Sequence, residues 1–248
     1  MNISMKDGIK MSMAISILLI IILAVIIIVI QYQVEGEKNM PYELSKITII
    51  STAEPEQNTD NTEETAKWNL KINQSNDVHF FIDKKNAKEG ELIESVTIEN
   101  VNVTKQPKKG TIKAYMPSSI ESSTFTYDNS YIVDEKLEYR GGKKSNPKTL
   151  EIGSQGGSAI IRFANTGVGN FISNEEVEIE HNGTLLTKVG VQDEEVQFQV
   201  NFDFIMEINN IKYKANITLD LPCENLSTEG KTAKEITDMS NIVFKRIK

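Results

Sequence analysis

The strongest pattern in the chain is an apolar run from Met11 to Ile30, in which Ser12 and Ser16 are the only polar residues. An α-helix rises about 1.5 Å per residue, so the run spans about 30 Å, the thickness of a bilayer's hydrocarbon core. A secretory signal has a shorter apolar core and a small-residue cleavage site. Gln31–Glu35, which follow the run, contain no such site. The run therefore predicts an uncleaved transmembrane signal-anchor.

Charges on the two sides of the run predict its orientation. Lys6 and Lys10 precede it together with Asp7, whereas the first charged residues after it are Glu35 and Glu37. Positively charged flanks stay in the cytoplasm. We therefore expect a cytoplasmic tail (1–10), a transmembrane helix (11–30), a stalk (31–43) and an extracytoplasmic β-region (44–248), with a possible subdivision near 117–130.

Beyond the anchor, apolar and polar positions alternate with the period of two that is typical of β-strands. The clearest alternation runs from Val196 to Ile208 and resumes from Ile211 to Leu221. The dipeptide Asn209–Asn210 separates the two runs, and asparagine tolerates the positive φ of a two-residue turn. The pattern predicts a long β-hairpin with one apolar and one polar face.

Weaker alternation predicts the other elements. The expected strands are Leu44–Thr52, Trp68–Ile72, Val78–Ile82, Thr111–Met116, Ser158–Ala164, Ile242–Ile247, and one bent strand from Leu92 to Val103 that changes face near Asn100. A second hairpin is expected from Val177–His181 and Thr184–Val189 around Asn182-Gly183. The expected turns and loops are Glu54–Thr65, Asn73–Asp77, Pro117–Ser130, a glycine turn at Gly153, Gly156 and Gly157, and a turn or short helix in Lys231–Ser240.

Antiparallel strands with one dry and one wet face must pack against a second such sheet. The fold class predicted from the pattern is therefore an all-β domain, an antiparallel β-sandwich of immunoglobulin-like or jelly-roll-like type, preceded by one transmembrane helix. The net charge of the whole chain is −8, which argues against nucleic acid or anionic lipid as a partner. Cys223 is the only cysteine, so no intramolecular disulfide forms, and we expect a buried or inert thiol.

The residues that carry catalytic chemistry are few. His79 and His181 are the only histidines, and both fall in strand patterns. Two acidic groups, Glu175–Glu180 and Asp193–Glu195, offer oxygen ligands for a hard cation such as calcium. Alternating glutamates more often form a solvated strand face, which is the interpretation we favour. The sequence therefore predicts no catalytic, cofactor-binding or metal-binding residue, and no cofactor.

Two segments carry resemblances. The strand Ala159–Ala164 followed by Asn165-Thr166-Gly167 is similar to the strand and Asn-x-Gly turn of bacterial and archaeal surface domains with immunoglobulin-like sandwiches. As a whole, the chain resembles uncharacterised single-pass envelope proteins of low-GC Gram-positive bacteria, through residues 12–47 and the segment Ile211–Pro222. This resemblance implies an envelope location and no particular activity.

The leading hypothesis is a non-enzymatic protein that binds, scaffolds or assembles in the cell envelope. Its expected partners are the membrane, through Met11–Ile30, and an envelope protein. One alternative is a pilin-like or secretion-apparatus subunit, although Gly8 is separated from the apolar run by Ile9 and Lys10. The other is a cell-wall glycosidase that uses two carboxylates.

Overall fold

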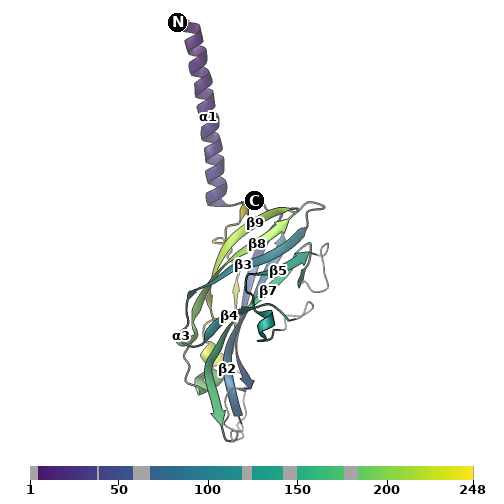
Figure 1. Ribbon diagram of the computed structural model, residues 1–248. Coiled ribbons are helices and arrows are strands. Elements are labelled where there is room, and N and C mark those ends of the chain that lie inside the picture. Colours follow the sequence, from purple (N-terminus) through teal and green to yellow (C-terminus); the bar gives the residue numbers. More distant parts are fainter. Residues whose placement is uncertain are drawn as a thin grey trace.

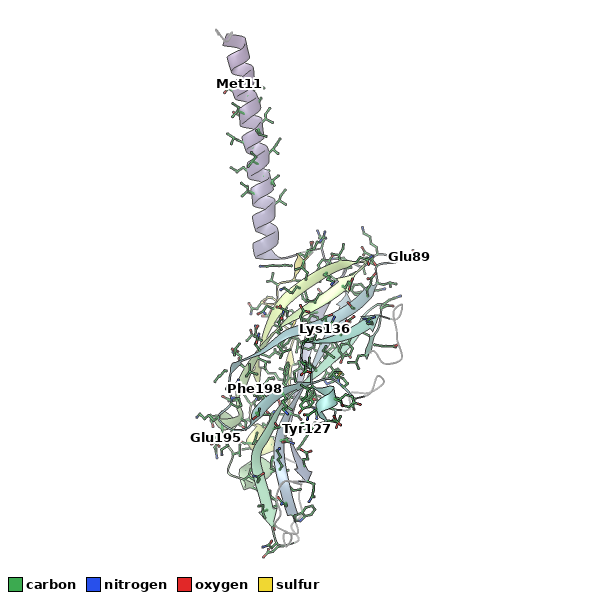
Figure 2. All side chains as sticks on the ribbon, viewed as in Figure 1. Met11, Glu89, Tyr127, Lys136, Glu195 and Phe198 are labelled. Carbon is green, nitrogen blue, oxygen red and sulfur yellow. The ribbon has the colours of Figure 1, made fainter. Side chains whose placement is uncertain are left out.

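The computed structural model describes residues 5–37, 39–57, 68–118, 125–141, 150–175 and 184–247 (Figure 1). Helix α1 (Met5–Glu35) precedes a domain built of two β-sheets. Residues Met11–Ile28 of α1 are entirely unburied, and their side chains point outward with nothing packed against them (Figure 2). The prediction of a helix long and apolar enough to cross a membrane is confirmed.

The two sheets pack face to face as an antiparallel β-sandwich, so the predicted fold class is confirmed. The five-stranded sheet has the order β10 (Lys231–Ile236), β1 (Tyr42–Gln57), β2 (Trp68–Lys84), β7 (Gly157–Ser173), β4 (Thr111–Tyr115). The six-stranded sheet has the order β11 (Lys245–Ile247), β9 (Ile211–Leu221), β8 (Phe198–Ile208), β3 (Ile93–Lys105), β5 (Lys136–Gly141), β6 (Leu150–Ile152). Neighbouring strands are antiparallel except β5 and β6.

The main core lies between the sheets and is organised around aromatic rings. Phe80 of β2 packs against Phe202 and Phe204 of β8, with ring centroids 5.7 and 4.9 Å apart. Phe163 of β7 lies 5.9 Å from Phe202. Because residues that alternate along each strand meet in this layer, the predicted dry faces are the inner faces of the sandwich.

A second, smaller core lies where the five-stranded sheet extends beyond the six-stranded one, at the end far from α1 (Figure 1). There the inner face of β1, β2 and β7 is covered by three short helices, α2 (Thr184–Lys188), α3 (Asp193–Val196) and α4 (Leu226–Glu229). The predicted strand Thr184–Val189 is therefore wrong. Leu185 and Leu186 are both fully buried, which consecutive residues of a strand with one dry face do not achieve.

The predicted turn Asn73–Asp77 is also wrong, because β2 runs through it without interruption. The Asn76 side chain accepts a hydrogen bond from Ser51 Oγ (2.7 Å) and donates one to the Phe163 carbonyl (2.9 Å). The Asn73 side chain accepts the Gly167 amide (2.9 Å) at a bulge in the β2–β7 pairing. Buried polar groups are tolerated when they are hydrogen-bonded, so this polar run can lie between the two cores, although Gln74 Oε1 is buried without a partner among the described residues.

Other boundaries differ from the prediction in smaller ways. β1 continues to Gln57, into the segment expected as a loop, and β7 continues through the expected turn at Asn165–Gly167. Lys231–Ser240, expected as a turn or short helix, contains β10 instead. The segments 58–65 and 176–183, with the predicted strand Val177–His181 and the Asn182-Gly183 turn, lie outside the described residues.

Three local predictions are confirmed. β8 and β9 form the long hairpin, and Asn209 and Asn210 both have positive φ, 49° and 61°. The pairing of β3 shifts at Asn100, whose φ is 55°. Cys223 is buried and makes no disulfide.

Helix α1 is attached to the sandwich by a short joint, defined here as Gly36–Glu37 and Phe244–Arg246. The Glu37 amide donates to the Phe244 carbonyl (2.7 Å), and Arg246 Nη2 lies 3.4 Å from the Glu37 carboxylate. Within the predicted stalk, α1 ends at Glu35 and β1 begins at Tyr42, which is fully buried. The chain thus enters the folded domain within a few residues of the helix end.

Candidate functional site

The structure places His79 on the outer face of the five-stranded sheet, in the middle of β2. It is half-buried, and its ring stacks at 6.3 Å on Phe81. Burial lowers the pKa of His79, and the nearby Asp77 carboxylate only partly offsets this effect. A neutral, stacked imidazole on a strand face matches the sequence-based interpretation of His79 as a strand residue. His181 lies outside the described residues.

The acidic run Asp193–Glu195 forms the first turn of α3 and has structural partners. Glu195 accepts the Gln192 amide (3.0 Å) and pairs with Lys109 (3.0 Å). Asp193 accepts the Ser227 amide (2.7 Å), which ties α3 to α4. Of the other acidic group, only Glu175 is described. No set of three His, Cys, Asp or Glu side chains within the described ranges is arranged to hold a metal ion.

The densest charged cluster lies on the outer face of the five-stranded sheet, around Arg162 of β7. Its guanidinium donates two hydrogen bonds to the Asp77 carboxylate, at 2.6 and 3.0 Å, and a third to Glu54 at 3.2 Å. The Tyr127 hydroxyl donates to the same Glu54 carboxylate (2.6 Å), and the Phe125 ring covers the guanidinium at 4.6 Å. Tyr127 lies about half-way between the two ends of the sandwich (Figure 2). Two hydroxyls complete the cluster, those of Thr52 and Ser75.

The electrostatics of this cluster indicate a structural clamp. Burial raises the pKa of Glu54, but the Arg162 charge and three hydroxyl donors outweigh it, so the pKa is lowered overall. Burial and the Glu54 charge raise the pKa of Tyr127 well above its ordinary value. Every carboxylate oxygen of Glu54 and Asp77 is engaged, so the cluster holds residues 125–131 on the sheet. Sequence reasoning missed it because Asp77 and Glu54 fell in segments expected as a turn and a loop.

A different kind of feature lies at the edge of the five-stranded sheet, where β10 pairs only with residues 47–52 of β1. The Gly230 carbonyl accepts the Ala53 amide (3.0 Å). Backbone groups alternate between the two sides of an antiparallel strand, so even-numbered residues of β10 face β1. The odd-numbered residues direct their N–H and C=O groups away from the sheet; they are Lys231, Ala233 and Glu235.

The opposite edge of the same sheet is closed. Along β4, the Ala114 carbonyl accepts the Val133 amide (2.9 Å), and the Met116 amide donates to Tyr131 (2.8 Å). In the six-stranded sheet the edge strands β6 and β11 have three residues each. β11 pairs only with Lys212–Lys214 of β9, so the rest of β9 is an unpaired strand edge. This edge and that of β10 together form one open side of the sandwich.

Two adjoining hollows, of about 460 and 240 Å³, lie along this open side. Both are lined by Cys223, Glu224 and Lys234, and we call them together the lateral groove. The larger hollow is also lined by Asn225, Glu229, Lys231, Thr232 and Ala233. The smaller one extends to the end of the six-stranded sheet, at Lys105 and Phe198. The larger hollow lies in the size range of small-ligand sites, about 300–1,000 Å³, and the smaller one extends it.

Charged groups of both signs line the lateral groove without partners. Lys105, Lys231, Lys234, Glu224 and Glu229 make no ion pair with one another or with any other residue that the structure describes. Thr232 also lines the groove, and its hydroxyl is buried without a hydrogen-bond partner among the described residues. The charged groups are free to contact a ligand, whereas the Thr232 hydroxyl is covered by the fold. Sequence reasoning did not single them out, since a short polar segment gives no signal of its position in a sheet.

Comparison of the chain with protein-family models, with curated proteins and with solved structures gives no match. The fold defines the class of the protein: a β-sandwich attached to an apolar helix that is long enough to cross a membrane.

Proposed function

We propose that this chain is a membrane-anchored envelope protein whose β-sandwich lies outside the cytoplasm and binds another envelope component without catalysing a reaction. The lateral groove carries this proposal, because it combines an unpaired strand edge, a hollow of ligand size and free charges of both signs. Such features serve recognition, since each offers an interaction that the folded chain itself leaves unused.

The position of the groove relative to α1 supports this function. β10 runs beside residues 47–52 of β1, and β1 begins at Tyr42, directly after the joint. At about 3.3 Å per strand residue, the groove lies roughly 15–35 Å from the helix end. A partner therefore reaches the groove without entering the bilayer. The lysines before the apolar run support an outward-facing domain.

The Arg162 cluster supports binding over catalysis. Two carboxylates that serve as acid and base in glycoside hydrolysis must face a substrate across an open space. Glu54 and Asp77 instead share one guanidinium and lie beneath Tyr127. Their charge is used to hold the fold together.

Site-specific photo-crosslinking in intact cells tests the proposal. A photoreactive amino acid at Ala233 or Glu229 lies in the lateral groove, whereas one at Asn102 lies on the outer face of the six-stranded sheet as a control. We expect a discrete adduct from the two groove positions and none from the control. Intact cells treated with protease should lose the β-sandwich and keep the helix. Protection of the sandwich, or equal adducts at all three positions, contradicts the proposal.

A further inference from the structure

The backbone of β10 presents a regular row of hydrogen-bonding groups that bond to no residue the structure describes. Lys231, Ala233 and Glu235 each direct one N–H and one C=O away from β1, with the spacing of a strand. An extended peptide is the ligand whose own groups repeat at that spacing. Addition of such a peptide to an exposed edge is an established mode of peptide recognition, in which backbone hydrogen bonds supply affinity.

The lateral groove provides the space beside this row. The larger hollow is bounded by β10 on one side and by Cys223–Asn225 and Glu229 on the other. The hollow of about 460 Å³ adjoins β10 and can take side chains of a strand that is added at its edge.

The charges of β10 restrict which peptide can bind. Lysines on edge strands commonly prevent pairing with arbitrary strands, because an added strand would remove their charge from water without supplying a partner, which costs free energy. Lys234 lines both hollows, and Lys231 lines the larger one; neither has a partner among the described residues. On β10 itself the charges without a described partner are both positive, since Glu235 pairs with Lys46, whereas the groove carboxylates Glu224 and Glu229 belong to the segment after β9. An acidic side chain placed beside the lysines of β10 offsets the cost of covering them, so these lysines disfavour an uncharged strand and favour an acidic one.

We propose that the lateral groove binds an extended, acidic peptide segment of a partner protein, which adds to β10 as a sixth strand of the five-stranded sheet. This inference rests on the proposed binding function and specifies its ligand. The second strand edge on the open side is the part of β9 beyond its pairing with β11 at Lys212–Lys214. Its outward side chains are Asn216, Thr218 and Asp220, without a lysine to select an acidic partner.

The test uses the full chain in lipid nanodiscs and a displayed library of random peptides as the probe. Selected peptides are resynthesised, and their affinities are measured against two substitutions of one residue. Ala233→Pro removes the central outward N–H and leaves the bonds to β1, because proline is tolerated on an edge strand when its N–H would face solvent. Ala233→Val keeps the N–H and is the matched control.

We expect the selected peptides to be rich in Asp or Glu, to bind the Ala233→Val variant like the wild type, and to bind the Ala233→Pro variant at least tenfold more weakly. Lys234→Gln should weaken binding by about twofold to fivefold and reduce the preference for acidic residues. On peptide binding, the Ala233 amide should exchange its hydrogen more slowly. Thermal melting of each variant verifies that β10 is still folded.

Other results overturn the inference. Equal binding to the proline and valine variants places the peptide elsewhere, and failure to select any acidic peptide removes the ligand class. Self-association of the wild-type chain that Ala233→Pro abolishes assigns the edge to a second copy instead. In each case, groove crosslinks in cells show whether the broader binding function stands without the strand addition.

Discussion

Tyr139 of β5 crosses the sandwich and hydrogen-bonds both backbone groups of Ile160 in β7. Its hydroxyl donates to the Ile160 carbonyl (2.5 Å) and accepts the Ile160 amide (3.1 Å). β4 pairs with β7 only from Arg162 to Thr166, so it does not reach Ile160. A side chain of the opposite sheet thus makes the hydrogen bonds to Ile160 that a neighbouring strand would otherwise make. Burial raises the pKa of the Tyr139 hydroxyl.

We expect Tyr139→Phe to lower the free energy of unfolding by about 1–3 kcal/mol, because it leaves two buried backbone groups without a partner while it preserves the ring. Urea denaturation followed by tryptophan fluorescence measures the change. Tyr131→Phe is the control, since no hydrogen bond of that hydroxyl to a described residue is found. Equal stability of the two variants would show that the Tyr139 contact contributes nothing.

Glu54 makes the stability of the domain depend on pH. Its pKa is lowered in the folded state, so below neutral pH the folded chain binds fewer protons at this site than the unfolded chain. The stabilisation is fully present above the ordinary value of 4.5 and is lost as the pH falls through the lower folded-state pKa.

We therefore expect Glu54→Gln to destabilise the domain at pH 7 by about 1–3 kcal/mol and to flatten the loss of stability in acid. Melting temperatures between pH 3 and 7 reveal both effects. Glu135→Gln, at an exposed position of the chain, should change neither. If the melting temperature of Glu54→Gln fell with acid as steeply as that of the wild type, Glu54 would not be the source of the pH dependence.

Gly36 allows the joint to close. Its φ is +79°, and an added Cβ would lie 2.4 Å from a Val243 methyl and 2.7 Å from the Phe244 carbonyl oxygen. We expect Gly36→Ala to open the joint and to speed amide exchange in residues 244–247, as measured by mass spectrometry. Gly90→Ala is matched in φ, +85°, but has open space around the new Cβ, so it should cost only about 1 kcal/mol of backbone strain. In the Gly90→Ala control, the amides of β11 should stay protected from exchange.

The turn of the long hairpin can be improved. Asn209 and Asn210 both have positive φ, which suits glycine better than asparagine. Asn210→Gly should raise stability by up to about 1 kcal/mol. Asn209→Gly should raise it less, because the Asn209 side chain accepts the Leu92 amide (3.3 Å). Thermal unfolding of both variants separates the two contributions.

The predictable parts of the fold are those whose hydrogen-bonding partners are near in sequence or whose apolar pattern is unbroken. The β8–β9 hairpin combines an unbroken alternation with its own turn, and α1 is apolar on every side. Asn73–Asp77 was misinterpreted because the groups that satisfy it come from distant segments. Ser51, Phe163 and Gly167 meet this polar run only after β1 and β7 have paired with β2.

The lateral groove was not predictable from the residues that form it. Lys231–Ile236 has little apolar alternation, because β10 is held by backbone pairing with β1 and is largely exposed. Whether a strand lies at an edge depends on the order of the whole sheet, which a single sequence does not state. The hollow beside it depends further on the turn at Cys223–Asn225.

The joint has a consequence for biosynthesis. Glu37 is synthesised before the first strand, whereas Phe244 and Arg246 follow only after every strand of both sheets except β11 has been made. The attachment of α1 to the sandwich therefore forms only after nearly the whole domain has been synthesised. Closure of the joint is thus a late event in the folding of the chain.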